Sequence, residues 1–248
     1  MTVDLIIRNG KVVTPQGVIE EDVAIAGEKI VSIGEPAARA EQEIDACGCW
    51  VMPGGVDPHA HIEQMSGMGV MNADTFETAT TSAAMGGTTT VISFAAQAKG
   101  QSIRDTVSDY RARATRGAMI DHAFHITVTD TTVLGHEADL GDLIQAGHRS
   151  IKVFTTYNIQ LSDREILDTM AVARQHGALV CVHAENDAII ARAKEELVAN
   201  GQLRPSDHAL SHPSMAEIEA VGRMWRFAEY LNQPVMLFHI STAEGAAI

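Results

Sequence analysis

The sequence predicts a parallel α/β fold, either a barrel or a doubly wound sheet, preceded by a small β region. Three observations support this prediction. Residues 1 to about 50 hold short β-branched runs broken by turn-forming glycines. From residue 51 onward, apolar strand-like runs alternate with helical stretches. Those runs are apolar throughout, which is typical of parallel strands buried on both faces of a sheet.

The N-terminal region, residues 1–50, is predicted to be a small β-sandwich. Asn9-Gly10, Gln16-Gly17 and Gly27-Glu28 are hairpin signals between its apolar runs. The pairing of its strands does not follow from the sequence.

The second region, residues 51–248, is predicted to hold six strands and six helices. We expect strands at residues 51–62, 88–96, 122–129, 150–157, 178–184 and 235–241. We expect helices at residues 74–85, 102–116, 140–146, 163–176, 187–199 and 215–231. Ser162 and Glu165 form a capping box before the fourth helix, and Gly177 stands where its C-terminal cap would be.

The number of strands bears on how much of a barrel is present. A complete eight-stranded barrel takes about 250 residues by itself, whereas six strands are found in residues 51–248. The sequence reaches Ile248 in what reads as the first turn of another helix, with no Gly or Pro to end it. We therefore expect the α/β region to be incomplete and the chain to be the first part of a longer protein.

Composition excludes several classes of function. Lys and Arg number 18 against 32 Asp and Glu, a net charge of −14 that argues against a nucleic-acid surface. No apolar run approaches the ~20 residues of a membrane span, and no signal peptide is evident. The cysteines, Cys47, Cys49 and Cys181, are odd in number and poorly spaced for bridging, which favours a reducing, cytoplasmic compartment.

Ligand-capable side chains recur at the ends of the predicted strands. His59 and His61 stand two apart, so in a strand they point to the same face. His183 and His239 end two later strands, and Lys152 lies inside an apolar one. If the strands are parallel neighbours, these five residues converge at one end of the fold, where such folds place their active sites.

Four imidazoles at equivalent strand ends favour a metal site, since imidazole suits zinc and neighbouring transition metals. A lone histidine in an apolar strand is more often a satisfied core residue. We interpret the remaining histidines in that way: His122, His125, His136, His148, His176, His208 and His212.

Lys152 is the sharpest single observation. Burial lowers the pKa of an amine, and a neutral amine can react with carbon dioxide to form a carbamate. A carbamate has two oxygens that can bridge two divalent ions. The alternative is an ordinary lysine paired with a carboxylate elsewhere in the chain.

Taken in order, these motifs resemble the amidohydrolase superfamily, most closely its dihydropyrimidinase and hydantoinase branch. The similarity extends over essentially the whole chain, and the ordered set is far more specific than any one motif. The motifs are PGGVDPHAH at 53–61, GGTTT at 86–90, KVFTTY at 152–157, VHAEN at 182–186 and HIS at 239–241.

The resemblance implies a TIM-like (β/α) barrel, here incomplete, with a binuclear metal centre. By this similarity His59 and His61 bind the more buried ion, and His183 and His239 bind the second. Carbamylated Lys152 bridges the two. The family's further metal-binding aspartate, on the last barrel strand, lies beyond residue 248, so the 248-residue chain alone is expected to be inactive.

The same resemblance suggests the substrate contacts. Tyr157 is expected to donate a hydrogen bond to the developing oxyanion; the alternative is a strand-end tyrosine that caps the core. The loop at 62–71 shapes the substrate pocket in this branch. It is rich in Gly and Met here, which suits an adaptable apolar wall. Met65 is our candidate substrate contact in that loop.

The implied reaction is hydrolysis of the cyclic amide bond of dihydropyrimidines or 5-substituted hydantoins, giving N-carbamoyl amino acids. A hydroxide bridging two ions, most simply zinc, would attack the ring carbonyl. The expected partners are a small cyclic amide or imide and further copies of the chain, as a tetramer or dimer, with neither nucleic acid nor membrane. The alternatives are an allantoinase or other cyclic amidohydrolase, and a non-catalytic, dihydropyrimidinase-like structural protein.

Overall fold

The computed structural model describes residues 2–34, 39–66 and 69–248. Two compact units divide the chain, Met1–Gly55 and Val56–Ile248. Gly67 and Met68 of the predicted pocket loop lie outside the described residues.

The N-terminal unit is built on one five-stranded sheet in the order β3-β2-β1-β4, with β5 also paired to β1. Its strands are β1 (Thr2–Thr14), β2 (Gly17–Ala26), β3 (Lys29–Ile33), β4 (Arg39–Asp45) and β5 (Trp50–Val51). The hairpins at Gln16-Gly17 and Gly27-Glu28 form as predicted, since β1–β2 and β2–β3 are antiparallel. The third predicted hairpin is wrong, because Asn9-Gly10 lies inside β1, where the pairing with β2 shifts register. The sequence predicts a sandwich, whereas the described strands make a single layer. The parallel pairing of β1 with β4 had no local sequence signal.

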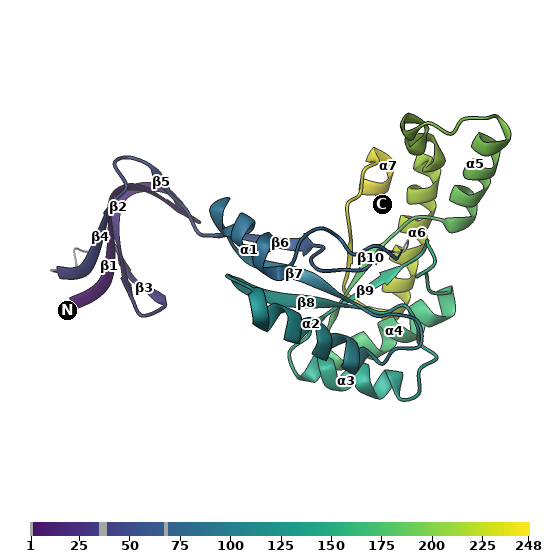
Figure 1. The fold of residues 1–248 in the computed structure, drawn as a ribbon, viewed down its shortest axis with the longest axis horizontal. Helices are drawn as coiled ribbons and strands as arrows, with labels where there is room; N and C mark the ends of the chain where they lie inside the picture. The colour runs from purple at the N-terminus through teal and green to yellow at the C-terminus, as the bar shows by residue number, and fades with distance from the viewer. Residues whose placement is uncertain (1, 35–38, 67–68) are drawn as a thin grey trace. The chain divides into compact units, whose positions relative to one another are not determined.

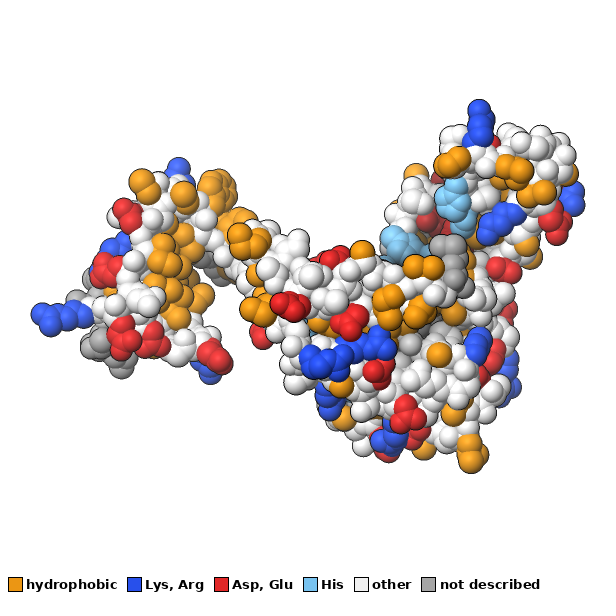
Figure 2. Space-filling model, in the orientation of Figure 1, with side chains coloured by type: hydrophobic (Ala, Val, Ile, Leu, Met, Phe, Trp, Pro, Cys, Tyr) orange, Lys and Arg blue, Asp and Glu red, His pale blue; other side chains and the backbone are white. Residues whose placement is uncertain are grey.

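The core of this sheet is small. Its buried cluster consists of Val3, Ile6 and Ala24. Large apolar side chains such as Ile30 and Trp50 stay exposed, and hydrophobic side chains gather on the visible face of this unit (Figure 2).

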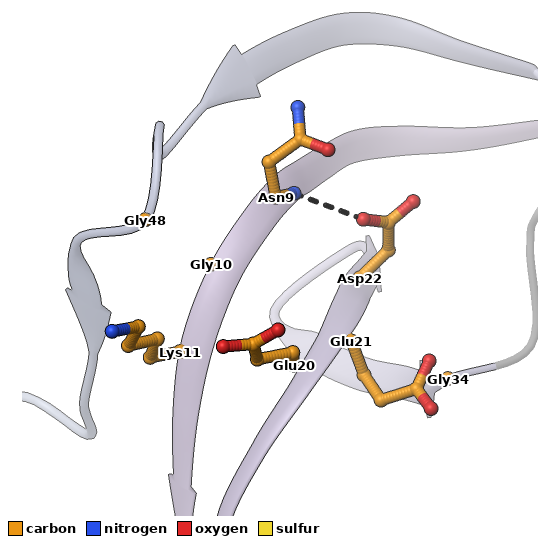
Figure 3. Close-up of a pocket in the computed structure, with 8 residues that line it drawn as sticks. All are labelled: Asn9, Gly10, Lys11, Glu20, Glu21, Asp22, Gly34 and Gly48. Carbon is orange, nitrogen blue, oxygen red and sulfur yellow. Dashed lines mark hydrogen bonds between the residues drawn. The ribbon is translucent and has the colours of Figure 1, made fainter.

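A pocket of about 530 Å³ opens on the N-terminal sheet. Figure 3 shows carboxylates of β2 and Lys11 of β1 on its walls, with the backbone N–H of Asn9 donating to Asp22 at 3.1 Å. None of the predicted site residues lines it.

The larger unit confirms the predicted alternation of strands and helices. Its six-stranded parallel sheet runs β11-β10-β9-β8-β7-β6, in strict sequence order. The strands are β6 (Gly55–Ala60), β7 (Thr88–Ala96), β8 (Asp121–Thr127), β9 (Ser150–Phe154), β10 (Leu179–His183) and β11 (Val235–Leu237). The sheet curls into a half-barrel, so the incomplete barrel expected from the sequence is what the structure has.

Helices follow the strands. They are α1 (Phe76–Met85), α2 (Ile103–Gly117), α3 (His136–Gln145), α4 (Asp163–His176), α5 (Asp187–Ala199), α6 (Ser214–Leu231) and α7 (Ala243–Ala246), with a 3₁₀ helix at Pro205–Ser211. Helices α2, α3 and α4 lie side by side along the sheet (Figure 1). No helix in the described ranges is both long and apolar enough to cross a membrane.

Helix ends follow local chemistry. The predicted capping box forms at α4, where Ser162 and Glu165 cap each other, and Gly177 ends the helix in the left-handed region at φ 74°. The largest difference from expectation is α3, which begins at His136 rather than residue 140. Gly135 permits this earlier start because it adopts φ 82°.

Alternation along the strands separates two environments. Side chains such as Ile126, Ile151 and Val153 face the helices and join the main hydrophobic core. Phe94, Cys181 and Phe238 form a separate cluster. They share the inner face of the curled sheet with Lys152, which stands one residue from both Ile151 and Val153. The inner face therefore carries the chemistry of this unit.

Candidate metal centre and substrate pocket

The predicted ligands all lie at the carboxyl ends of the strands of one sheet. His59 is in β6 and His61 follows it, Lys152 is in β9, and His183 is the last residue of β10. His239 follows β11 and adopts φ 41°, a left-handed conformation that is uncommon outside glycine.

Ring-to-ring distances link the four imidazoles in a chain. The centroids of His59 and His61 are 5.2 Å apart. Those of His59 and His239 are 5.5 Å apart, and those of His183 and His239 are 4.6 Å apart. The structure thus brings together all four histidines that the sequence singled out.

Lys152 is 1% exposed, and its Nζ has no hydrogen-bond partner among the described residues. Three phenylalanine rings surround the amine; Nζ lies 4.2 Å from the ring centroid of Phe238, 4.7 Å from that of Phe154 and 5.8 Å from that of Phe94. Burial lowers the pKa of Lys152 to about 7. A substantial share of the amine is therefore neutral at physiological pH.

Burial favours the neutral form of His59, His183 and His239. Burial, followed by the nearby charge of Lys152, lowers the pKa of His59 to about 4. Burial likewise lowers the pKa of His183 to about 4, against the opposing hydrogen bond from Glu185. The pKa of His239 is lowered by burial and by Lys152. Neutral imidazole is the form that binds metal.

The carboxylate of Glu185 connects two histidines of the site, His183 and His212. Its Oε2 lies 2.6 Å from Nε2 of His183, and its Oε1 lies 2.9 Å from Nδ1 of His212. Burial opposes ionisation of Glu185, but the hydrogen bonds with His212 and His183 outweigh it and lower the pKa of the carboxyl. A His183 ring that donates from Nε2 leaves the Nδ1 lone pair free for a ligand, as carboxylate–histidine–metal arrangements require.

Tyr157 lies beside His183, in the turn after β9. Its ring centroid is 5.2 Å from that of His183, and its backbone N–H donates to Asp187 Oδ1 at 3.3 Å. Tyr157 adopts φ 68°, a left-handed backbone conformation that is strained for a residue other than glycine. Burial, then the charge of Glu185, raises the pKa of Tyr157, which keeps the phenol a hydrogen-bond donor.

A cavity of about 590 Å³ lies next to these side chains. His61, Tyr157 and Met65 line it together, and Met65 is 52% exposed at its edge. Met65 also forms an antiparallel bridge with Met71, which closes the loop after β6. The predicted substrate contacts thus share one cavity with a predicted ligand.

The donor chemistry of the site suits divalent metal ions. Four imidazoles and a buried amine that has no partner among the described residues meet at one end of the sheet. Across residues 2–34, 39–66 and 69–248, however, no three His, Cys, Asp or Glu side chains stand close enough to hold an ion by themselves.

Sequence reasoning missed two members of the site. Glu185 lies in the quoted VHAEN motif, two residues after His183, and that spacing was an available signal. His212 was interpreted as a core histidine, yet it contacts Glu185. Nothing local marks it, because it reaches the site from the segment between the 3₁₀ helix and α6.

Comparison with known proteins connects this geometry to a family. A sequence profile described as "Amidohydrolase family" matches residues 50–212. The chain is 39% identical over 244 residues to D-hydantoinase of Ralstonia pickettii, covering 98% of this chain and 53% of that protein. It is 35% identical over 247 residues to a D-phenylhydantoinase of Escherichia coli, covering 97% and 53% respectively.

Solved structures agree. A D-hydantoinase structure superposes with a TM-score of 0.95 at 38% identity, covering 99% of this chain and 54% of that one. The dihydropyrimidinase of Brevibacillus agri NCHU1002 gives a TM-score of 0.92 at 35% identity, covering 98% and 53%. The chain spans about half the length of the relatives it matches.

Proposed function

The chain belongs to the amidohydrolase family, and from that premise we propose that the protein hydrolyses the ring amide bond of hydantoins or dihydropyrimidines. One observation carries the proposal: His59, His61, Lys152, His183 and His239 meet beside a cavity at the carboxyl end of one parallel sheet. Relatives named D-hydantoinase and dihydropyrimidinase support the choice of substrate class.

His59 and His61 would hold one divalent ion, His183 and His239 a second, and Lys152, once carbamylated, would contribute oxygens to both. Zinc is the proposed ion because imidazole-rich sites suit it. Bound ions of this kind activate water and polarise a carbonyl. The lowered pKa values of His59, Lys152 and His183 support the assignment, because it requires their neutral forms.

Tyr157 would act on the substrate directly. Its phenol keeps its proton, so it can donate to the oxygen on which charge develops as the ring carbonyl is attacked. Met65 would contact the ring substituent from the rim of the cavity. Since a methionine side chain is flexible, it would accept substituents of different shapes.

An assay of ring opening tests the proposal. The purified protein would be incubated with hydantoin, dihydrouracil and allantoin. We expect N-carbamoyl products from the first two substrates, and loss of turnover after chelation. Turnover of allantoin alone would instead make the protein an allantoinase.

A non-catalytic homologue is the second candidate, and one observation favours it. The three rings around Lys152 Nζ resemble a cation–π cage, which stabilises a protonated amine. A permanently protonated Lys152 would repel metal ions. Elemental analysis decides between the two, because the catalytic reading requires about two ions per chain.

The remaining parts of the proposal concern the setting of the protein. We place it in the cytoplasm, because Cys47, Cys49 and Cys181 are all free thiols. We expect it to form homo-oligomers, which sedimentation of the purified protein would test.

A further inference from the structure

Two buried polar side chains on neighbouring strands lack partners. Thr127, in β8, is 3% exposed, and its Oγ1 has no hydrogen-bond partner in the part of the chain that the structure describes. Lys152, in β9, is 1% exposed, and its Nζ has none either. An unsatisfied buried hydroxyl costs free energy, so an orphaned pair suggests that something is bound there in the working protein.

The strand register places these two residues directly beside each other. Thr127 is the partner of Lys152 in the parallel pairing of β8 with β9. Partners in a parallel ladder point to the same face of the sheet. That face is the inner one, because Ile126 and Val128 on either side of Thr127 belong to the outer core.

The side chains of Ala96, Thr127, Lys152 and Cys181 lie at one level across neighbouring strands, and we call this row the lysine layer. It has room beside Thr127. Ala96 of β7 is its partner on the other side, so only a methyl group fills that position. Ala96 and Thr127 both line the cavity that Tyr157 shares. A small group attached to Lys152 would therefore extend along a layer that opens on the substrate pocket.

The other polar group in this layer already has neighbours. Cys181 of β10 is the partner of Lys152 on the far side. Its Sγ lies 3.4 Å from Ser150 Oγ and 4.0 Å from His125 Nδ1. Of the side chains described in this layer, Thr127 alone offers a hydroxyl that is not otherwise engaged.

We propose that Thr127 is a positioning residue whose hydroxyl donates a hydrogen bond to the carboxylate formed when Lys152 takes up carbon dioxide. The inference rests on the proposed function, which includes that carbamate. The neutral amine forms an N–C bond to carbon dioxide, one C=O π pair moves onto oxygen, and the amine releases one proton to water. The product is an anion with two acceptor oxygens, which a lone hydroxyl donor suits.

The test measures carbon dioxide on the protein itself. Native mass spectrometry from neutral bicarbonate buffer would follow the added mass of one carbon dioxide as its concentration is varied, with Lys152→Ala as the background. We expect Thr127→Val to need roughly tenfold more carbon dioxide for half occupancy, the effect of losing one hydrogen bond to a charged group. Thr127→Ser keeps the hydroxyl and should behave like the wild type.

Ser93→Ala is the matched control. Ser93 Oγ, in β7, is another buried hydroxyl with no partner, but Ser93 adjoins Phe94 and so faces away from the inner side of the sheet. Its removal should leave carbon dioxide uptake unchanged. If Thr127→Val does not fold, judged by circular dichroism and thermal unfolding, Thr127→Ala provides the same comparison.

The outcomes separate the two proposals. Equal uptake by the wild type and by a folded Thr127 variant without the hydroxyl overturns the role of Thr127 alone. A metal-loaded, active wild type with no added carbon dioxide overturns the carbamate itself. Loss of uptake in Thr127→Ser as well as in Thr127→Val also contradicts the inference, because the hydroxyl then makes no difference.

Discussion

The imidazole rings of His59 and His239 lie 5.5 Å apart, centroid to centroid, although they belong to opposite edges of the sheet. His59 is in β6, the strand at one edge, and His239 lies two residues after the end of β11, the strand at the other. Only strong curling of the sheet brings these edges together. The curl therefore assembles the candidate centre, and each ligand depends on the geometry of the whole sheet.

Replacing Lys152 tests the bridging role. We expect both Lys152→Ala and Lys152→Arg to lower kcat by more than about 100-fold, exceeding the loss typical of an outer partner. Arginine keeps the positive charge but cannot take up carbon dioxide. A short-chain carboxylic acid should restore part of the activity of Lys152→Ala. Near-normal turnover of Lys152→Arg would show that a cation, not a carbamate, is required.

Glu185 is expected to tune the metal affinity of His183. Changing Glu185 to Gln replaces a charged acceptor of the Nε2 hydrogen bond with a neutral one. It should weaken binding of the second ion by about 10–100-fold, measured by competition with a chromogenic chelator. His212→Gln should have a smaller effect in the same direction, because it contacts Glu185 and not His183. Unchanged affinity in both variants would make this network purely structural.

Metal content tests the proposed centre. We expect about two divalent ions per chain in the purified protein and loss of turnover when they are removed, because bound ions of this kind activate water. Dialysis against chelator, followed by elemental analysis and a turnover assay, measures this. Full turnover by protein that is free of divalent ions would contradict the expectation.

Acid should destabilise the metal-free protein through its histidines. The folded-state pKa values of His59 and His183 are about 4, against about 6.5 for histidine in an unfolded chain. The unfolded state therefore binds more protons between these values, and stability falls as pH drops below about 6.5 and levels off below about 4. Urea unfolding at pH 7 and pH 5 should differ by roughly 1 kcal/mol per ring, after allowing for partial exposure.

Variants identify the source of that pH dependence. His59→Asn and His183→Asn should each flatten the dependence, and the double variant should flatten it further. A wild-type difference retained in the double variant would assign the effect to other groups.

Strand and helix positions in the larger unit followed from the sequence because continuous apolar runs, caps and glycines are local signals. Two strands end earlier than the sequence predicted. The strand expected to reach residue 157 ends at Phe154, since Tyr157 turns into the left-handed region. The strand expected to reach residue 241 ends at Leu237, and two residues later His239 also adopts a left-handed backbone conformation.

The convergence of the five candidate ligands was also predictable, because the strand ends of a parallel sheet meet at one edge. The contact between Glu185 and His212 was not, since it joins a strand end to a distant segment with no periodic pattern of its own. That the hydroxyl of Thr127 lacks a partner among the described residues could not be predicted from the sequence either. A threonine in a strand is ordinary, and only the register beside Lys152 gives it meaning.

The strict sequence order of the strands has a consequence for biosynthesis. β6 is made first and β11 last, so His59 leaves the ribosome on the order of ten seconds or more before His239. During that interval the early strands can pair with one another, but the four imidazoles are not yet all in place. If the protein binds metal as proposed, the nascent chain would have to stay folded and unaggregated without the complete set of donors, and metal loading would be a late event in its maturation.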